Sequence, residues 1–267
     1  MKPVHPGSLV TLTTDFGLAD HYVGSMKGVL LSRCPGVRII DISHDVPPFS
    51  IYSGAYTIDQ AAPYFPAGTI HVIVIDPGVG TARKPILLEA MNQFFIAPDN
   101  GVLSMISARD AKAEARELTN RDLWLTSPSS TFHGRDIFAP VAAALASDVA
   151  NAQKVGPILT KLELLPDLDA RQIKPGRWEG KLLSIDRFGN AITNFRVDAF
   201  RKLPSSRFSM RVRKHGITTF KSTFGDAPEG VCFAYFGSSG YLELAVKQQS
   251  AAALLNASAG DRVTLRL

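Results

Sequence analysis

Short apolar runs in the first half of the chain alternate with segments of helical periodicity, and this alternation constrains the fold most. The runs are apolar at successive positions, as strands covered on both faces must be. They occupy residues 9–15, 37–43, 69–76, 85–90, 93–99 and 113–119. Apolar residues at helical spacing lie between or after them, at 19–34, 51–62 and 135–147, with Ser50 as the expected N-cap of the second segment. The pattern is typical of βαβ units, and we expect a Rossmann-like α/β domain over residues 1–160.

The pattern changes after residue 160. Residues 161–177 contain Pro166, Pro175 and Gly176, which interrupt regular structure, so we expect a linker there. Further on, short strand-like runs recur without intervening helices. They occupy residues 178–186, 190–197, 206–214, 217–223, 230–237, 241–246 and 261–267. Close spacing of short strands is typical of a small antiparallel barrel or sandwich, and we expect a β-barrel domain over residues 178–267.

The charge balance raises the question of a nucleic-acid partner. The 267 residues carry a formal net charge of +5, and the densest basic stretch runs from Arg201 to Gly216. In that stretch Phe208, Met210 and Val212 alternate with polar residues, as in a half-buried strand whose other face meets water. No aromatic stacking motif accompanies it. We therefore expect a solvated strand face and no nucleic-acid partner.

Targeting signals and cysteine clusters are both missing from the sequence. The first ten residues form neither a signal peptide nor a transit peptide, and no segment approaches about 20 uninterrupted apolar residues. We expect a soluble cytoplasmic protein with no membrane partner. Cys34 and Cys232 lie far apart and in no metal-binding pattern, so we interpret both as small buried hydrophobic residues and expect no metal site.

The segment IDPGVGTARKP, residues 75–85, joins an apolar strand to a glycine-rich loop. Asp76 ends the strand and Arg83 follows seven residues later. Open α/β sheets bind their ligands at the carboxyl ends of strands. The loop lacks the GxxxxGK[ST] spacing, and its acid would repel phosphate. A cationic or neutral polar ligand therefore fits the segment better than a phosphate does.

Other polar residues follow predicted strands. They are Asp15, Asp99 with Asn100, and His133. Each has a structural alternative: Asp15 as an Asx turn, Asp99 as a helix cap, and His133 as a core or N-cap histidine. Their shared position at strand carboxyl ends favours a common site over these separate roles.

Seven motifs, in order along the chain, carry a family resemblance. They are TTDFG with DHYVGSMKG, DISHDVPP, FPAGTIHVIVIDPGVGT followed by Arg83, APDNG, TFHGRDIFAP and IDRFGNAITN. The set, running from about Thr11 to Ala252, resembles the S-adenosyl-L-methionine (SAM) hydroxide adenosyltransferase family, also called DUF62, which is related to fluorinase and chlorinase. The resemblance implies hydrolysis of SAM to adenosine and L-methionine without a cofactor. It also implies a homotrimer, with each site between the α/β domain of one subunit and the β domain of its neighbour.

The resemblance implies that Asp76, Arg83 and His133 are the catalytic residues. Free water has a pKa of about 15.7, and an ordinary aspartate with a pKa of about 3.9 is too weak a base to deprotonate it fully. Asp76 and His133 are therefore expected to orient the water, while Arg83 and the sulfonium stabilise the developing hydroxide. The proton acceptor stays open at this point.

The resemblance also implies substrate contacts. Asp15 is expected to bind the ribose hydroxyls, and Asp186 and Asn190 the amino-acid end of the substrate. Phe188 is expected either to stack on adenine or to belong to the β-domain core. The remaining expected contacts are Asp20 and Tyr22 at a helix start, and Ser238 and Ser239 in a small polar turn near the amino-acid end.

Three other functions compete with the hydrolase. A halogenase would use halide in place of water, and the Asp76 carboxylate disfavours it by repelling the anion. A non-catalytic trimer that binds adenosine or SAM would have no need for the three catalytic residues together. A metal-dependent hydrolase would use Asp15, His44, Asp45 and His133, which lack a regular ligand spacing.

Overall fold

A computed structural model describes residues 8–200 and 208–267, and its internal contacts divide the chain into two compact units, Met1–Leu165 and Pro166–Leu267. The division falls inside the segment 161–177 that was expected to be a linker. Three sequence features lie wholly or partly outside the described residues. They are the first seven residues of the N-terminal segment, residues 201–207 of the basic stretch, and the first two residues of the strand predicted over 206–214.

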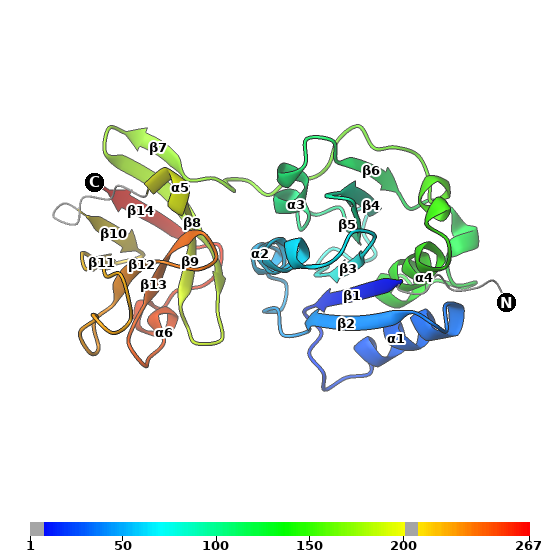
Figure 1. Ribbon diagram of the computed structural model, residues 1–267, viewed down its shortest axis with the longest axis horizontal. Coiled ribbons are helices and arrows are strands. Elements are labelled where there is room, and N and C mark those ends of the chain that lie inside the picture. Colours follow the sequence, from blue (N-terminus) through cyan, green and yellow to red (C-terminus); the bar gives the residue numbers. More distant parts are fainter. Residues whose placement is uncertain (1–7, 201–207) are drawn as a thin grey trace. The chain divides into compact units, whose positions relative to one another are not determined.

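A mixed six-stranded sheet forms the centre of the first unit (Figure 1), with strand order β2-β1-β3-β5-β4-β6. Its strands are β1 (Leu9–Thr14), β2 (Arg38–Ser43), β3 (Ile70–Val74), β4 (Pro85–Ala90), β5 (Gln93–Pro98) and β6 (Glu114–Glu117). The β1–β2, β1–β3 and β3–β5 pairs are parallel, whereas β4 runs antiparallel to β5 and β6. Met91 and Asn92 both have positive φ in the β4–β5 hairpin, as a tight two-residue turn requires.

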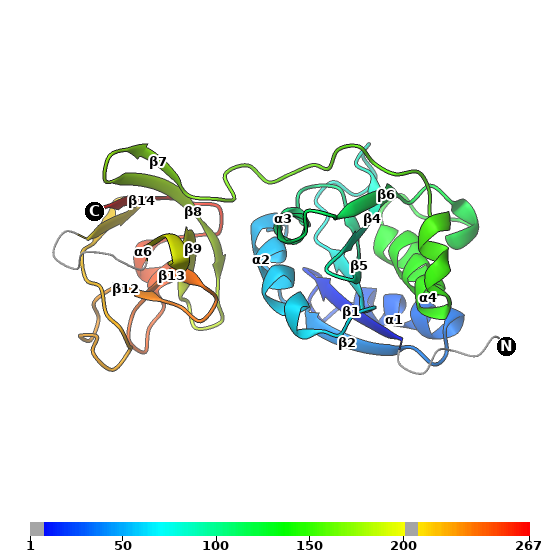
Figure 2. The ribbon, with the colours of Figure 1, turned by 45° about the horizontal axis from the view of Figure 1, so that its top comes forward.

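Helices cover both faces of this sheet (Figures 1 and 2). On one face α1 (Tyr22–Arg33) and α4 (Ala139–Ser147) share a core with β1, β3 and β5 that includes Met26 and Val141. On the other, α2 (Ile51–Ala61) and α3 (Ser104–Arg109) bury Ile58 and Ile106 against β3 and β4. The predicted α/β layering is confirmed. So is Ser50 as the N-cap of α2, since its hydroxyl accepts a hydrogen bond from the Ser53 amide.

Single turns complete the first unit. They are the 3-10 turns η1 (Ala62–Tyr64), η2 (Arg121–Leu123) and η4 (Val149–Lys154), and the π-helical turn η3 (Gly134–Phe138) that leads into α4. Among residues 8–200 and 208–267, no helix is long and apolar enough to cross a membrane.

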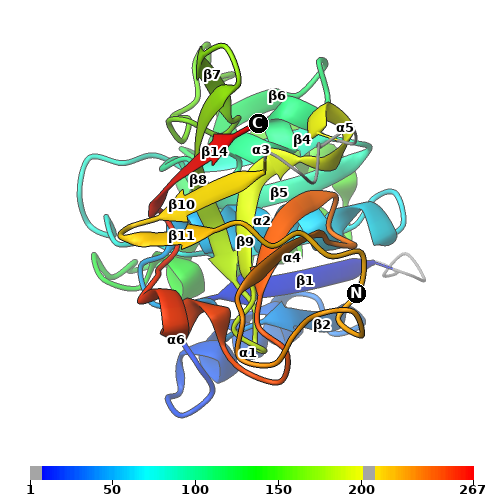
Figure 3. The same ribbon diagram turned by 90° about the vertical axis from the view of Figure 1, so that its left-hand side faces the viewer.

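The second unit is a nearly closed antiparallel sheet (Figure 3), with strand order β11-β10-β14-β8-β9-β13-β12 and β7 paired with β8. Leu182, Phe195, Met210, Leu244 and Val263 are among the side chains of its core. The strands are β7 (Arg171–Lys174), β8 (Arg177–Ile185), β9 (Ala191–Arg196), β10 (Ser209–Val212), β11 (His215–Ile217), β12 (Phe233–Phe236), β13 (Tyr241–Ala245) and β14 (Arg262–Arg266). The barrel-like architecture predicted for this part is confirmed.

Local details of the second unit differ from the sequence pattern. The strand predicted over 217–223 is wrong beyond Ile217, because Phe220 forms only an isolated bridge with Ala234. The pattern also missed two short helices, α5 (Val197–Phe200) and α6 (Ala251–Leu255). α6 begins where the Ser250 hydroxyl accepts a hydrogen bond from the Ala253 amide. Strand β7 lies inside the segment expected to be a linker, so the chain joins the sheet from Arg171 onward.

Both cysteines are free thiols, and they differ in exposure. Cys34 is buried in the core of the first unit, as expected. Cys232 is only partly buried in the second unit, and burial raises the pKa of its thiol to about 11.

Candidate active site

A pocket in the first unit lies where β1 and β3 end. Because these strands are adjacent and parallel, the residues that follow them reach the same edge of the sheet. The lining residues come from the loops after both strands, from the turn before α2 and from the segment before α4. They are Asp15, Phe16, Phe49, Val74, Asp76, Val79, Thr131, Phe132, His133 and Gly134.

Asp76 and Arg83 form a bidentate ion pair beside this pocket. The Nε of Arg83 donates to Oδ1 of Asp76 over 3.0 Å, and its Nη2 donates to Oδ2. Both side chains are more than nine-tenths buried: 8% of the Arg83 side chain and 5% of the Asp76 side chain are exposed. The guanidinium also lies over the Phe138 ring, 5.5 Å from its centroid. This geometry fixes the orientation of the carboxylate and compensates the cost of burying its charge.

His133 contacts the same guanidinium. Nη2 of Arg83 lies 2.7 Å from Nδ1 of His133. A guanidinium has only donors, so Nδ1 must be the acceptor, and the proton of the neutral ring is then on Nε2. Burial lowers the pKa of His133, and the positive charge of Arg83 lowers it further. The imidazole is therefore held neutral, with Nε2–H as its free donor.

One donor of Arg83 has no hydrogen-bond acceptor. Its Nη1 is buried and unpaired among the residues that the structure describes. A buried donor without a partner costs about 1–3 kcal/mol, and a bound water molecule or anion would recover that energy. The Asp76 carboxylate keeps unused lone pairs, because its two oxygens offer about four acceptor positions. The ion pair therefore leaves one donor of Arg83 and acceptor capacity on Asp76 unused.

The loop from Asp76 to Arg83 approaches the His133 segment closely. Gly80 has φ +79°, and a Cβ there would lie 2.6 Å from the Ser130 carbonyl oxygen. Only glycine permits this approach without displacing backbone. On the other side, His133 immediately precedes η3, a π-helical turn of a kind found frequently at functional sites. Residues 50 positions apart are brought together by these two local conformations.

Asp15 lies in the same pocket and is held by a backbone amide. Its Oδ2 accepts a 2.8 Å hydrogen bond from the Phe49 N–H. Burial raises the pKa of Asp15, and the negative charge of Asp76 raises it further, against the hydrogen bond from Phe49. Phe49 is 72% exposed and has φ +65°, which is strained for a bulky residue. An exposed aromatic ring therefore stands at the pocket in a fixed, unusual conformation.

Asp20 and Tyr22 lie beside the pocket and do not line it. Asp20 is exposed in the segment before α1, and Tyr22 is the first residue of that helix. The Tyr22 ring packs against Phe16 and Phe132, with centroid separations of 5.6 and 5.1 Å. Tyr22 therefore supports two lining side chains, whereas no contact ties Asp20 to the pocket in the described part of the chain.

The other polar residues after strands have structural contacts. Asp99 accepts a hydrogen bond from the Glu163 amide over 2.9 Å, and Asn100 donates to the Ile75 carbonyl over 2.9 Å. His44 contacts Thr14 through Nδ1 at 2.8 Å and lies 3.0 Å from Asp41 through Nε2. Within the described ranges, no group of three or more His, Cys, Asp or Glu residues is arranged to hold a metal ion.

In the second unit, Asp186 organises the turn between β8 and β9. Oδ1 accepts from the amides of Phe188 and Asn190 at 2.9 and 2.8 Å, and Oδ2 accepts from the Asn190 side chain at 2.7 Å. Asn190 is buried, whereas Phe188 is 79% exposed. The suggestion that Phe188 belongs to the β-domain core is therefore wrong, and an exposed aromatic ring lies at the tip of a rigid turn.

Ser238 and Ser239 occupy the turn between β12 and β13. Ser238 is exposed, and the Ser239 hydroxyl donates to Oε1 of Glu243 over 2.6 Å. Glu243 is buried and also accepts from the Tyr235 hydroxyl. Sequence reasoning missed this carboxylate, which sits in an apolar strand pattern and fixes the serine turn from beneath.

The two turns of the second unit lie at opposite ends of the β9–β13 pair. In the antiparallel register Ala191 lies opposite Leu244 and Arg196 opposite Tyr241. The separation is five residues along β9 and three along β13, where the register shifts. The Ser239 hydroxyl nevertheless reaches Glu243, which lies opposite Ile192 near the start of β9.

Comparison with known proteins assigns both halves of the chain. Residues 10–156 match the model of the SAM hydroxide adenosyltransferase N-terminal domain, and residues 180–264 match that of the C-terminal domain. The chain belongs to the SAM hydroxide adenosyltransferase family. The site described above lies within the N-terminal family domain, and the two polar turns lie within the C-terminal one.

Individual relatives span almost the whole chain. A protein of Salinispora tropica named (R)-S-adenosyl-L-methionine hydrolase is 40% identical over 97% of this chain and 97% of its own. A protein of Actinoplanes named fluorinase is 29% identical, over 98% and 99% of the two chains. The crystal structure of an uncharacterized conserved protein from Thermotoga maritima superposes with a TM-score of 0.85 at 37% identity, covering 97% of this chain and 100% of that one. The family resemblance predicted from the seven motifs is confirmed.

In this member of the SAM hydroxide adenosyltransferase family, several residues that line the pocket were not predicted from the motifs. Phe16, Phe49, Val79 and Phe132 line the pocket although none was predicted as a contact. Phe16, Val79 and Phe132 stand inside the quoted motifs, next to the charged residues that drew attention. The signal for Phe49 was an aromatic residue in a proline-rich turn, where no core pattern explains it.

Proposed function

We propose that this protein hydrolyses SAM, with water attacking carbon 5′ of the adenosyl group and L-methionine leaving as a neutral thioether. The products are adenosine and L-methionine. The observation that carries this proposal is the contact of Asp76, Arg83 and His133 at one pocket, in a chain of this family. Four relatives named (R)-S-adenosyl-L-methionine hydrolase, among them the Salinispora tropica protein, are 35–40% identical to this chain and support the same reaction.

The three side chains would hold one water molecule. Asp76 accepts one of its hydrogens, while Nε2–H of His133 or Nη1–H of Arg83 donates to its oxygen. His133 does not act as the base through Nδ1, because that lone pair already faces Arg83. Asp76 is thus the acceptor for the proton that water loses as the C–O bond forms.

The proposed reaction needs only a weak base. The sulfonium carries positive charge next to the carbon under attack and leaves without charge, so the approach of a hydroxide-like oxygen is electrostatically favourable. Holding the water in line behind the C–S bond is worth about 7–11 kcal/mol through positioning. Exclusion of bulk water strengthens both contributions. Orientation by Asp76 with partial proton transfer therefore suffices, and no residue with a strongly raised pKa is needed.

The substrate is further specified by its configuration at sulfur. The hydrolase relatives are named for (R)-S-adenosyl-L-methionine, a detail that the sequence motifs do not contain. We extend that preference to this protein. Incubation with the separate R and S epimers tests it, and we expect adenosine to form faster from the R epimer.

Substrate contacts follow the same proposal. Asp15, fixed by the Phe49 amide, would accept hydrogen bonds from the ribose hydroxyls. Asp186 and Asn190 would contact the amino-acid end of the substrate, with Ser238 and Ser239 near the same end, and the exposed Phe188 ring would stack on the adenine. In a homotrimer, the two turns that carry these residues would come from the neighbouring subunit, so that each complete site uses two chains.

Product analysis tests the reaction. Purified protein incubated with SAM should yield adenosine and L-methionine in equal amounts. Added chloride or fluoride distinguishes the halogenase, which would form a 5′-halo-5′-deoxyadenosine in place of adenosine. The Asp76 carboxylate disfavours that route, since it would face the halide at close range. Binding of adenosine with no turnover of either SAM epimer would instead support a binding protein.

A further inference from the structure

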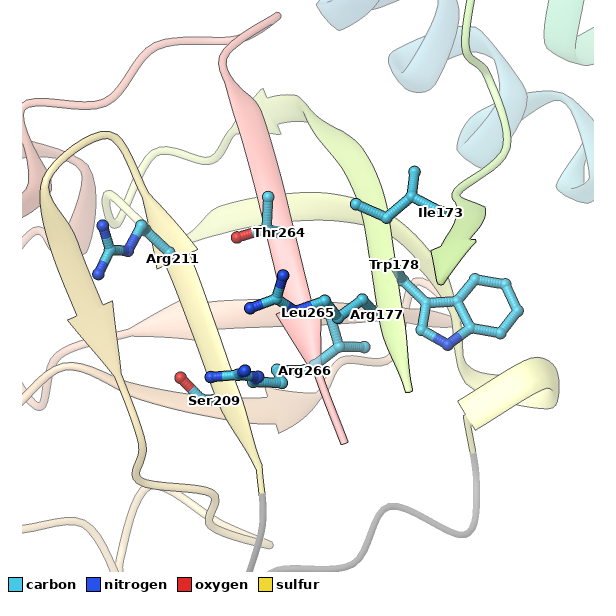
Figure 4. Close-up of a pocket in the computed structure, with 8 residues that line it drawn as sticks. All are labelled: Ile173, Arg177, Trp178, Ser209, Arg211, Thr264, Leu265 and Arg266. Atoms are coloured by element: carbon cyan, nitrogen blue, oxygen red, sulfur yellow. The ribbon is translucent and has the colours of Figure 1, made fainter. Parts of the chain in front are cut away.

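The sheet of the second unit carries a hollow that the proposed reaction does not use (Figure 4). Its volume is about 390 Å³, within the range of small-molecule sites. Three arginines and two hydroxyl residues line it together with apolar side chains: Arg177, Arg211, Arg266, Ser209 and Thr264. The arginines are exposed, and they come from three adjacent strands, β8, β10 and β14.

The strand register brings the arginines together. Arg266 lies directly opposite Arg177 on one side and opposite Ser209 on the other, while Arg211 lies opposite Thr264. Directly opposed residues on one face have Cβ atoms about 4.5–5.5 Å apart, and diagonal ones about 7–8 Å. Figure 4 shows the arginines gathered over β10 and β14, with the Trp178 ring turned away from them. The long side chains can therefore converge on one anion.

The charges of this cluster are unbalanced. Three neighbouring bases on the sheet are paired, Arg171 and Arg262 with Glu179 and Arg213 with Asp261, whereas Lys174, directly opposite Arg177 on β7, adds a further positive charge. Arg177, Arg211 and Arg266 form no ion pair with any acid in the described part of the chain. Like charges directly opposite each other destabilise a sheet, so a bound anion would relieve a cost of the fold.

We propose that Arg177, Arg211 and Arg266 form a binding site for an oligophosphate group of two or three linked phosphates. Guanidinium forks match phosphate oxygens in bidentate geometry, and the hydroxyls of Ser209 and Thr264 add further donors. The ion pairs of Arg171, Arg213 and Arg262 neutralise three further bases of the sheet, which limits the extent of the positive surface and favours a compact anion over a long polymer. Trp178 packs edge-on against Phe200 at 5.0 Å, so it is not a free platform for base stacking.

Calorimetric titration at constant ionic strength tests this site. The ligands are inorganic orthophosphate, pyrophosphate and tripolyphosphate, with ATP as a separate arm, all titrated in the presence of saturating adenosine so that the proposed active site is occupied. We expect affinity to increase with the number of phosphates, because more guanidiniums are engaged, and ATP to bind about as tightly as tripolyphosphate. Much tighter binding of ATP would show that a nucleoside is recognised and would overturn the proposal of a phosphate-only site.

Matched arginine variants separate the site from general charge. Combining Arg177→Gln with Arg266→Gln should weaken tripolyphosphate binding about tenfold or more, through loss of bidentate contacts. Arg213→Gln removes one charge from the same region but from a paired residue, and should weaken binding by about twofold or less. Equal losses per charge in Arg177→Gln and Arg213→Gln would reduce the effect to net charge and overturn the proposal.

Two further measurements exclude other uses of the arginines. A 20-nucleotide RNA is titrated in parallel, and binding tighter than tripolyphosphate that depends on Arg213 as well would indicate a nucleic-acid surface instead. The mass of each variant is measured by light scattering. A change of oligomeric state in Arg266→Gln would assign the cluster to a subunit interface and would overturn the proposal. Thermal melting confirms that the exposed substitutions leave the fold intact.

Discussion

At the scale of single residues, the ion pair of Asp76 and Arg83 is the feature on which the proposed chemistry depends. We expect Asp76→Asn to lower kcat by roughly 10²–10⁴-fold, because an amide cannot take the proton from water. Adenosine binding should change little, since Asp76 is proposed to touch the water and not the nucleoside. Adenosine release followed by chromatography and adenosine affinity measured by calorimetry give the two quantities.

A second ion pair in the same unit, between a buried carboxylate and a guanidinium that is 40% exposed, provides the control. Arg109 donates through Nε and Nη2 to both carboxylate oxygens of Asp59, which is 2% exposed and does not line the pocket. Asp59→Asn should cost about 1–3 kcal/mol of stability, because it weakens the hydrogen bonds of a buried side chain while the exposed Arg109 charge stays in contact with water. Its kcat at a temperature well below melting should stay near that of the parent. An equal fall of kcat in both variants would assign the Asp76 effect to folding.

The neutral state of His133 predicts a pH dependence. Burial and Arg83 lower its pKa below the ordinary value of 6.5. The folded protein thus favours the neutral imidazole. The contribution of this ring to the free energy of unfolding is fully present above pH 6.5 and is lost as the pH falls towards the pKa in the folded state. Protonation removes the acceptor at Nδ1 and places two cations in contact. We therefore expect kcat to stay level from pH 8 to about 6.5 and to fall below that.

The His133→Gln variant checks the assignment of this acidic limb. Glutamine keeps an acceptor and a donor without titrating, so the limb should move to lower pH while some activity remains. Burial and the negative charge of Asp76 also raise the pKa of Asp15, so the titration of Asp15 can add a second acidic limb to the pH profile of kcat. An unchanged profile in His133→Gln would attribute the acidic limb to a carboxyl group such as Asp15.

At the scale of elements, the loop between β3 and β4 positions the charged residues. We expect Gly80→Ala to destabilise the fold by about 1–3 kcal/mol, because alanine is strained at φ +79° and its Cβ would meet the Ser130 carbonyl oxygen. The displaced loop should also lower kcat. Gly68→Ala is the matched control, since Gly68 has φ +80° with nothing near its Cβ. It should lose about 1 kcal/mol in chemical denaturation and keep its kcat.

Elements were predictable where burial and capping act locally. The apolar runs of β1 and β3 and the Ser50 cap of α2 follow from short-range pattern, and the structure contains them. Strand β7, with the sequence RQIK, was missed because it is exposed and has no apolar pattern; it is fixed by pairing with β8. The segment 218–223 reads as a strand by composition, yet its backbone finds only one bridge, through Phe220.

The site was predictable in its residues but not in its contacts. Asp76 stands out as a polar residue directly after an apolar strand, and His133 as a polar residue just before a helix. Their common contact with Arg83 depends on a glycine at Gly80 and on the π-helical turn after His133, which no periodicity reveals. The role of Glu243 beneath the serine turn could not be predicted from the sequence either, because it depends on the cross-strand pairing with Tyr235.

At the scale of the whole molecule, the proposed site residues are divided between two units. Asp15, Asp76, Arg83 and His133 belong to residues 1–165, and the turns around Asp186 and Ser239 to residues 166–267. The same residues could form a site within one chain or a site shared between two chains. The two arrangements differ only in whether both units of a site belong to the same chain. Subunit mixing distinguishes them. We expect the parent protein to be a trimer by light scattering.

In the mixing experiment, inactive Asp76→Ala chains are combined with inactive Asp186→Ala chains. Asp186→Ala should inactivate because it removes the three hydrogen bonds that shape its turn. If each site joins the first unit of one chain to the second unit of its neighbour, some mixed interfaces contain neither substitution. After random exchange these are about one quarter of all interfaces in a cyclic trimer, so activity should return to about that fraction. Sites within single chains would give no recovery at any mixing ratio, once exchange has been verified by native mass spectrometry.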